Sequence, residues 1–211
     1  FLFLCILLFL TVRSFHSEEK EEKAETPPPS DNIDTSKVDV QELVINSTKP
    51  SDSEAPVSIT VSSMGDCTLG TDVNFAQSTS LPAYYDTYGP DYFFQNVRSI
   101  LEADDLSIVN MEGTLTTSDQ RADKTYAFKG SQDYVRILTG SSIEAANLAN
   151  NHSMDYGDQS YTDTISALDD AGVASFGFDH VKILDIKGIK VGVTGIYELA
   201  EHLEKKQQVK E

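Results

Sequence analysis

Side chains that can bind a metal ion or move a proton follow three separate apolar stretches of this sequence. In chain order they are Asp66, then Asn110 with Glu112, then Asn150, Asn151, His152 and Asp155 within the run 147–157. Carboxylate and carboxamide oxygens together with one imidazole suit Mg, Mn, Fe or Zn. Two such ions about 4 Å apart can clamp a phosphoryl group and activate a water molecule.

Each of these groups also has a purely structural explanation, and the residue types alone leave both open. Asp66 lies just after a glycine, where a turn carboxylate is common, and Glu112 has the chemistry of a helix cap or a solvated residue. His152 would equally serve as a hydrogen-bonded loop histidine. Cys67 is read most simply as a small buried residue, with a reactive thiol as the alternative. The remaining histidines are expected to be solvated surface residues: His16, His180 and His202.

The elements that would position these groups alternate between strands and helices. Strands are predicted at 57–61, 106–109, 143–149 and 174–178, and a hairpin around Lys187-Gly188 at 181–186 and 189–196. Residues 126–129 are predicted to be extended. Helices are predicted at 90–105, 131–140 and 157–171. This alternation indicates a layered α/β domain. If the strands are parallel neighbours, the three polar groups meet at one end of the sheet.

The first residues have the composition of an export segment. Residues 1–12 are apolar apart from Thr11, and the chain opens on Phe1 rather than Met. They fall short of the ~20 residues that span a bilayer, so we read 1–16 as a truncated signal anchor or signal peptide, with an uncleaved anchor favoured. The protein is therefore expected at the cell membrane, held by a single N-terminal anchor with its domain outside the cytoplasm.

An acidic, proline- and serine-rich stretch at 17–56 is predicted to be a disordered linker, because it has too little apolar surface to offset its ordering entropy. The folded part is expected to begin at Val57 and to occupy 57–211. Nothing follows the last predicted strand that would cover the sheet, so we expect the C-terminal part of the domain to be missing.

The overall negative charge limits which kinds of molecule can bind to the protein. The formal net charge is −18 at pH 7 and the sequence pI is about 4.4. Nucleic acid is not expected as a partner, because phosphate contacts need clustered Lys and Arg. A polyanionic substrate would also be repelled unless a bound cation offset the charge.

Several motifs resemble the bacterial CapA family, the poly-γ-glutamate capsule biosynthesis proteins also called PgsA. The resemblance extends over about 57–197, and the motifs are Gly65-Asp66, Asn110-Met111-Glu112, Tyr126-Ala127-Phe128-Lys129 and Ala149-Asn150-Asn151-His152-Ser153-Met154-Asp155-Tyr156-Gly157. It implies a metallophosphoesterase-like sandwich with Asp66, Glu112 and Asn151 as metal ligands. His152 would be the general acid or hydrogen-bond donor, and Asp155 would orient it. The family's later histidines, in a His-Pro-His type motif, are absent from this chain.

The resemblance implies an exported, membrane-anchored protein that takes part in making poly-γ-glutamate or a related anionic capsule polymer. Metal-dependent phosphoesterase-like hydrolysis or transfer is one reading of its role. The alternative is a non-catalytic component that binds or exports the polymer. The implied partners are the anionic polymer or its precursor and other membrane proteins of capsule synthesis. The implied cofactor is a divalent metal (Mn, Mg, Fe or Zn).

Overall fold

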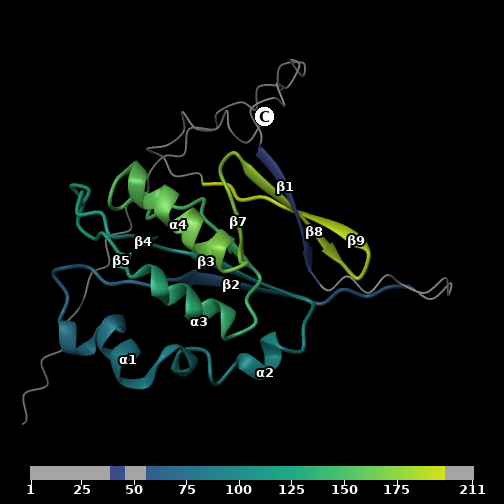
Figure 1. Cartoon of the computed structure of the whole chain (residues 1–211), viewed down its shortest axis with the longest axis horizontal. Coiled ribbons are helices and arrows are strands. Elements are labelled where there is room, and N and C mark those ends of the chain that lie inside the picture. Colours follow the sequence, from purple (N-terminus) through teal and green to yellow (C-terminus); the bar gives the residue numbers. More distant parts are fainter. Residues whose placement is uncertain (1–38, 46–55, 198–211) are drawn as a thin grey trace, which may run out of the picture. The chain divides into compact units, whose positions relative to one another are not determined.

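The computed structural model describes residues 56–197 together with the backbone of residues 39–45 (Figure 1). The predicted anchor at 1–16 and most of the predicted linker lie outside these ranges, so both stay predictions. None of the helices in the described ranges is long and apolar enough to cross a membrane.

The main sheet has four parallel strands. They are β2 (Val61–Cys67), β3 (Leu106–Met111), β6 (Ala145–Asn147) and β7 (Ala174–Phe176), in that spatial order. Every neighbouring pair in this sheet is parallel. The predicted α/β class and the parallel arrangement are therefore confirmed. The carboxyl ends of β2, β3 and β6 lie side by side, as the sequence predicted.

A second sheet contains β1 (Asp39–Ile45), β8 (His180–Ile186) and β9 (Ile189–Val193), with β8 in the middle. Strands β8 and β9 form the predicted antiparallel hairpin. Lys187 and Gly188 make its turn with φ values of 54° and 80°. A short parallel pair, β4 (Thr114–Leu115) with β5 (Lys129–Gly130), completes the strands of the described ranges.

Helices and the second sheet pack on opposite faces of the main sheet. The helices are α1 (Leu81–Tyr88), α2 (Arg98–Leu101), α3 (Val135–Thr139) and α4 (Asp158–Asp170), with short 3-10 turns at Gln77–Thr79, Pro90–Tyr92 and Gln132–Tyr134. Side chains alternate along a strand. Val109 and Met111 accordingly pack among the helices, whereas Leu106 packs against Leu184 and Ile186 of β8.

The positions of two helices, α3 and α4, agree closely with the sequence prediction. Ser131 precedes α3, and its hydroxyl accepts a hydrogen bond from the Asp133 N–H at the start of the preceding 3-10 turn. Helix α4 buries Thr164 and Leu168 on its inner face. Gly172 follows its end with φ 77°, a backbone conformation that glycine adopts without strain.

The predicted helix at 90–105 is wrong over most of its length. A 3-10 turn at Pro90–Tyr92 and the four-residue α2 replace it, and the Val97 backbone leaves the helical region with φ −122°. Leu101 is buried, but Ile100 is 61% exposed, so the apolar spacing does not mark one buried face. Helix α1, which begins with Leu81-Pro82, was not foreseen.

Several strand boundaries also differ from the sequence prediction; the strand predicted at 143–149, for example, extends only over Ala145–Asn147. The first strand begins at Val61 rather than Val57, because its partner β3 begins only at Leu106. Within the predicted linker, Asp39–Ile45 pair with β8 as β1. The end of that segment, Leu43-Val44-Ile45, has strand-forming residue types, which the acidic composition of 17–56 as a whole concealed.

Candidate functional site

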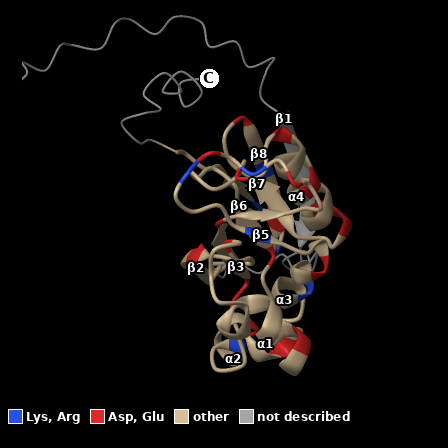
Figure 2. Cartoon of the chain, turned by 90° about the vertical axis from the view of Figure 1, so that its left-hand side faces the viewer, with Lys and Arg blue, Asp and Glu red and all other residues tan. Residues whose placement is uncertain are grey.

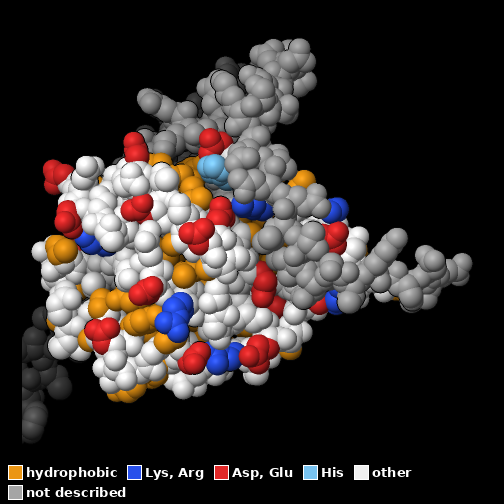
Figure 3. All heavy atoms as spheres, in the orientation of Figure 1, with side chains coloured by type: hydrophobic (Ala, Val, Ile, Leu, Met, Phe, Trp, Pro, Cys, Tyr) orange, Lys and Arg blue, Asp and Glu red, His pale blue; other side chains and the backbone are white. Residues whose placement is uncertain are grey.

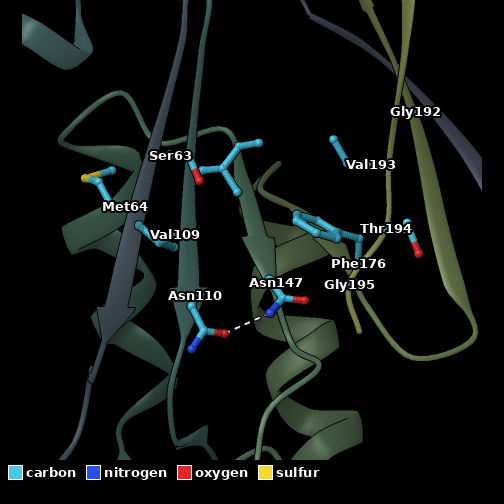
Figure 4. Close-up of a pocket in the computed structure, with 11 residues that line it drawn as sticks. Ser63, Met64, Val109, Asn110, Asn147, Phe176, Gly192, Val193, Thr194 and Gly195 are labelled. Atoms are coloured by element: carbon cyan, nitrogen blue, oxygen red, sulfur yellow. Dashed lines mark hydrogen bonds between the residues drawn. The ribbon is translucent and has the colours of Figure 1, made fainter. Parts of the chain in front are cut away.

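A row of polar side chains crosses the carboxyl end of the main sheet. Asp66 lies opposite Asn110, and Asn110 lies opposite Asn147, in the parallel register. Asn110 Nδ2 donates to Asp66 Oδ1 at 2.7 Å. Asn147 Nδ2 donates to Asn110 Oδ1 at 2.8 Å (Figure 4). We call this row, together with Asn150, the amide ladder.

Asn150 connects the ladder to the loop that follows β6. Its Nδ2 donates to Asn110 Oδ1 (3.1 Å) and to the Met111 carbonyl (2.9 Å). Its Oδ1 accepts from the backbone N–H of His152 at 2.9 Å. Asn150 therefore fixes the backbone that carries His152, with both ends of its carboxamide engaged.

The loop is closed by a buried carboxylate, Asp155. Its Oδ2 lies 2.7 Å from His152 Nδ1 and accepts from the Phe128 N–H at 2.6 Å. Its Oδ1 accepts from Lys124 Nζ at 2.7 Å, and its side chain has no exposed surface. These contacts hold the imidazole with Nε2 directed toward Glu112, 3.4 Å from its Oε1.

Glu112 and Asp66 form a pair of neighbouring carboxylates. Burial raises the pKa of Glu112, and the nearby Asp66 carboxylate raises it further. Such a pair favours either a shared proton or a cation between the two groups. The oxygen donors fit a hard divalent ion. Within the described residues, however, no three His, Cys, Asp or Glu side chains are arranged to hold a metal, so carboxamide oxygens would have to complete the coordination.

Asn151, the third predicted ligand, is placed differently from the other two. It is exposed on the loop, and its backbone carbonyl accepts from Lys124 Nζ at 2.8 Å. The structure thus brings four predicted residues together: Asp66, Glu112, His152 and Asp155. Their proposed roles in metal binding and proton transfer stay predictions.

Sequence reasoning missed the contribution of Lys124 and the structural roles of Asn147 and Asn150. Lys124 lies in a polar loop without periodicity, so no spacing signal marks it. Asn147 and Asn150 belong to the motif run itself. Their position at the end of a parallel strand was the available signal, because register places such residues in one row.

Two other predicted side chains have less to do with the site. Burial raises the pKa of the Cys67 thiol to about 12, which opposes the reactive-thiolate alternative. His180 is half-buried, with Nε2 3.5 Å from Asp179, so it is less solvated than the sequence predicted. His16 and His202 lie outside the described residues.

A pocket of about 470 Å³ borders the ladder between the main sheet and the β9 strand (Figure 4). Asn110 and Asn147 lie at one end of it, and its other lining includes Met64, Phe176 and the segment 192–195. The chain passes very close to Asn147 here. A Cβ built on Gly195 would lie 1.8 Å from Asn147 Oδ1.

Gly195→Ala is therefore expected to push Asn147 out of the ladder and to lower the free energy of unfolding by about 1–3 kcal/mol, the usual cost of overpacking. Gly192→Ala is the matched control, because a Cβ there meets no atom within 4 Å. Urea unfolding followed by circular dichroism gives both values. Equal stability of the two variants would contradict the close contact at Gly195.

Acidic side chains dominate the surface around these elements. Figure 2 shows Asp at several positions of α4, and Figure 3 shows Asp and Glu spread over one face with fewer Lys and Arg. The basic residues nearest the site are paired: Arg121 with Asp72 at 2.8 Å and Lys124 with Asp155 at 2.7 Å.

Comparison with known proteins places the chain among capsule proteins. The family described as "Bacterial capsule synthesis protein PGA_cap" matches residues 60–211. The chain is 31% identical over 119 residues, 51% of its length, to the capsule biosynthesis protein CapA of Bacillus anthracis. It is 40% identical over 76 residues (36% of the chain) to a probable polyglutamine synthesis accessory protein of Mycobacterium tuberculosis. It is 35% identical over 79 residues (36% of the chain) to the PGA biosynthesis protein CapA of Bacillus subtilis. The chain spans between 20% and 29% of the length of these three relatives.

Proposed function

This chain belongs to the bacterial capsule synthesis protein family PGA_cap, and from that membership we propose that it acts in the biosynthesis of poly-γ-glutamate or a related anionic capsule polymer. The proposal includes export and a single membrane anchor within 1–16, with the domain outside the cytoplasm and other membrane proteins of capsule synthesis as partners. The observation that carries the chemical part is the Glu112 carboxylate, which lies 3.4 Å from His152 Nε2 and has the Asp66 carboxylate as its neighbour.

In this proposal Asp66 and Glu112 hold a divalent metal ion, and Asn151, which the structure leaves exposed on the neighbouring loop, is the third proposed ligand. When bound, the ion would polarise the group under attack and activate water. The amide ladder supports Asp66, since Asn110 donates a hydrogen bond to its Oδ1. Orientation of a ligand by such an outer hydrogen bond is a recurring feature of metal sites.

His152 would deliver a proton to the leaving group through Nε2, the ring nitrogen that points toward Glu112. Asp155 would keep Nδ1 occupied, so that the imidazole stays in one orientation. The layering of helices, parallel sheet and second sheet supports the finer proposal of a metallophosphoesterase-like sandwich. Metal-dependent hydrolysis or transfer on a polymer precursor follows from these assignments.

Asp66→Asn is expected to weaken manganese binding by roughly tenfold or more, because it removes one charge from the donor set. His152→Ala should leave manganese affinity nearly unchanged and reduce turnover of a chromogenic phosphodiester. Calorimetric titration with manganese measures the first effect and a colour assay the second. Asp91→Asn is the control, since that carboxylate is largely exposed and pairs with Arg98. Unchanged affinity in Asp66→Asn would remove the metal site from the proposal.

The alternative function is a non-catalytic component that binds or exports the anionic polymer. Polymer binding without manganese binding or turnover would select this alternative.

A further inference from the structure

The peptide group that leads into His152 is bound at both of its polar atoms. Its carbonyl oxygen, which belongs to Asn151, accepts from Lys124 Nζ at 2.8 Å. Its N–H, which belongs to His152, donates to Asn150 Oδ1 at 2.9 Å. Because a peptide unit is planar, one hydrogen bond on each side fixes the plane from which the imidazole side chain leaves the backbone.

The ammonium group of Lys124 also fixes the carboxylate that faces the imidazole. Lys124 Nζ donates to Asp155 Oδ1 at 2.7 Å and lies 3.4 Å from His152 Nδ1. With Oδ1 engaged by the ammonium, Oδ2 is the oxygen that faces the ring, at 2.7 Å from Nδ1. Lys124 therefore contacts both the peptide group before His152 and the carboxylate that holds its ring.

These contacts decide which ring nitrogen of His152 carries the hydrogen when the imidazole is neutral. A carboxylate only accepts hydrogen bonds and an ammonium only donates them. The carboxylate contact at Nδ1 is the shorter one, 2.7 Å against 3.4 Å, so Nδ1 carries the hydrogen and donates it to Asp155. Since the partner of one ring nitrogen sets the state of the other, Nε2, which faces Glu112 at 3.4 Å, is the nitrogen that gains and releases a proton.

Lys124 is itself held by a short turn with several hydrogen bonds. Its carbonyl oxygen accepts from Arg121 Nη1 at 3.1 Å, and its N–H donates to the Ala122 carbonyl at 3.0 Å. Arg121 in turn pairs with the buried Asp72 carboxylate at 2.8 Å. The Ala122 N–H donates to the Asp155 carbonyl at 2.8 Å, so the turn is also joined to the loop of His152 through the backbone.

From these contacts we propose that Lys124 is a positioning residue for His152: it holds the peptide group and the carboxylate that orient the imidazole, and so keeps the ring hydrogen on Nδ1. Lys124 acts through Asp155 and the backbone and does not act on the reacting atoms. The inference rests on the proposed function for the role of His152 in proton transfer. The arrangement itself involves only groups of this chain.

Heteronuclear NMR of the ring nitrogens in the metal-free 211-residue chain at pH 8 tests this arrangement. In the wild type the hydrogen is expected on Nδ1 of His152. In Lys124→Met this single tautomer should be lost, and exchange of the His152 backbone N–H with solvent should become roughly tenfold faster or more, because its peptide group loses one of two hydrogen bonds. Lys124→Arg should restore both values, since a guanidinium offers several donors to the same carboxylate and carbonyl.

Lys187→Met is the matched control for Lys124→Met. Lys187 likewise donates to one carboxylate, that of Asp105 at 2.7 Å, and to one backbone carbonyl, that of Ser58 at 3.1 Å. It lies in the β8–β9 turn and takes no part in the contacts around His152. Lys187→Met should therefore keep the wild-type tautomer and exchange rate of His152.

A hydrogen on Nε2 of His152 in the wild type would overturn the proposal, and this result requires no variant to fold. So would a wild-type tautomer and exchange rate in Lys124→Met, or an equal change in Lys187→Met. Manganese titration of the wild type separates this inference from the proposed function. Loss of the tautomer in Lys124→Met without manganese binding in the wild type would support the positioning role and contradict the metal site. Manganese binding with an unchanged imidazole in Lys124→Met would do the reverse.

Discussion

Asp155→Ala is expected to lower the free energy of unfolding by about 3–5 kcal/mol, the loss typical of removing one partner from a buried ion pair. The substitution leaves Lys124 Nζ, His152 Nδ1 and the Phe128 N–H without their shared acceptor. The loop that carries His152 and the segment that leads to β5 would both lose the hydrogen bonds that hold them in place. Urea unfolding at pH 7 measures the change, and amide hydrogen exchange of the loop shows whether it opens.

Asp119→Ala is the matched control for this variant. It removes the same charge from a pair of similar length, 2.8 Å to Lys129, but its carboxylate is 94% exposed. An exposed pair of this kind contributes about 0–1 kcal/mol. A loss in Asp155→Ala no larger than that in Asp119→Ala would contradict the structural role assigned to the buried carboxylate.

The second large effect is expected for Asp72→Ala, which should lower the free energy of unfolding by about 3 kcal/mol or more. The carboxylate has no exposed surface and accepts from Arg121 and from two backbone N–H groups. Alanine leaves those two N–H groups, of Asn74 and Ala127, without an acceptor. Urea unfolding gives the loss, and Asp91→Ala serves as the exposed-carboxylate control.

Asp72 also gives this prediction a definite pH dependence. Burial alone would raise its pKa, but the hydrogen bonds from Ala127, Arg121 and Asn74 outweigh burial and lower the pKa from 3.8 to about 2. The group therefore stabilises the folded state fully above the unfolded-state pKa, and this contribution disappears as the pH falls from about 4 to about 2. Asp72→Asn should flatten the stability profile in that window. A profile as steep as that of the wild type would assign the acid sensitivity to other groups.

The parts of the fold that could be predicted from sequence are those in which the residue pattern within one segment is enough to indicate its secondary structure. The buried run Leu106 to Val109 gave β3, and the alternation on both sides of Lys187-Gly188 gave the β8–β9 hairpin. Polar residues directly after parallel strands were correctly expected to meet, because register alone decides that they do. Ser131 and Gly172 marked helix ends through local capping chemistry.

The rest depended on contacts that leave no local pattern. Lys124 and Asp155 are 31 positions apart, and Asp72 and Ala127 are 55 positions apart. No spacing rule connects such pairs, so the buried ion pairs that hold the site were missed. The prediction of a helix at 90–105 was wrong because a local pattern was present but the tertiary packing did not follow it. Its apolar spacing was suitable, but the packing around α2 buries Leu101 and leaves Ile100 exposed.

The amide ladder also bears on how the chain folds. Its hydrogen bonds join residues that are 44 and 37 positions apart, and β6 pairs with each neighbour over only three residues. A slip of one residue in either pairing would turn an amide to the helix-covered face. The hydrogen bonds of the polar row thus form completely only when β2, β3 and β6 are in the correct register. A chain with a misaligned strand would be left with unpaired carboxamides at this edge of the sheet.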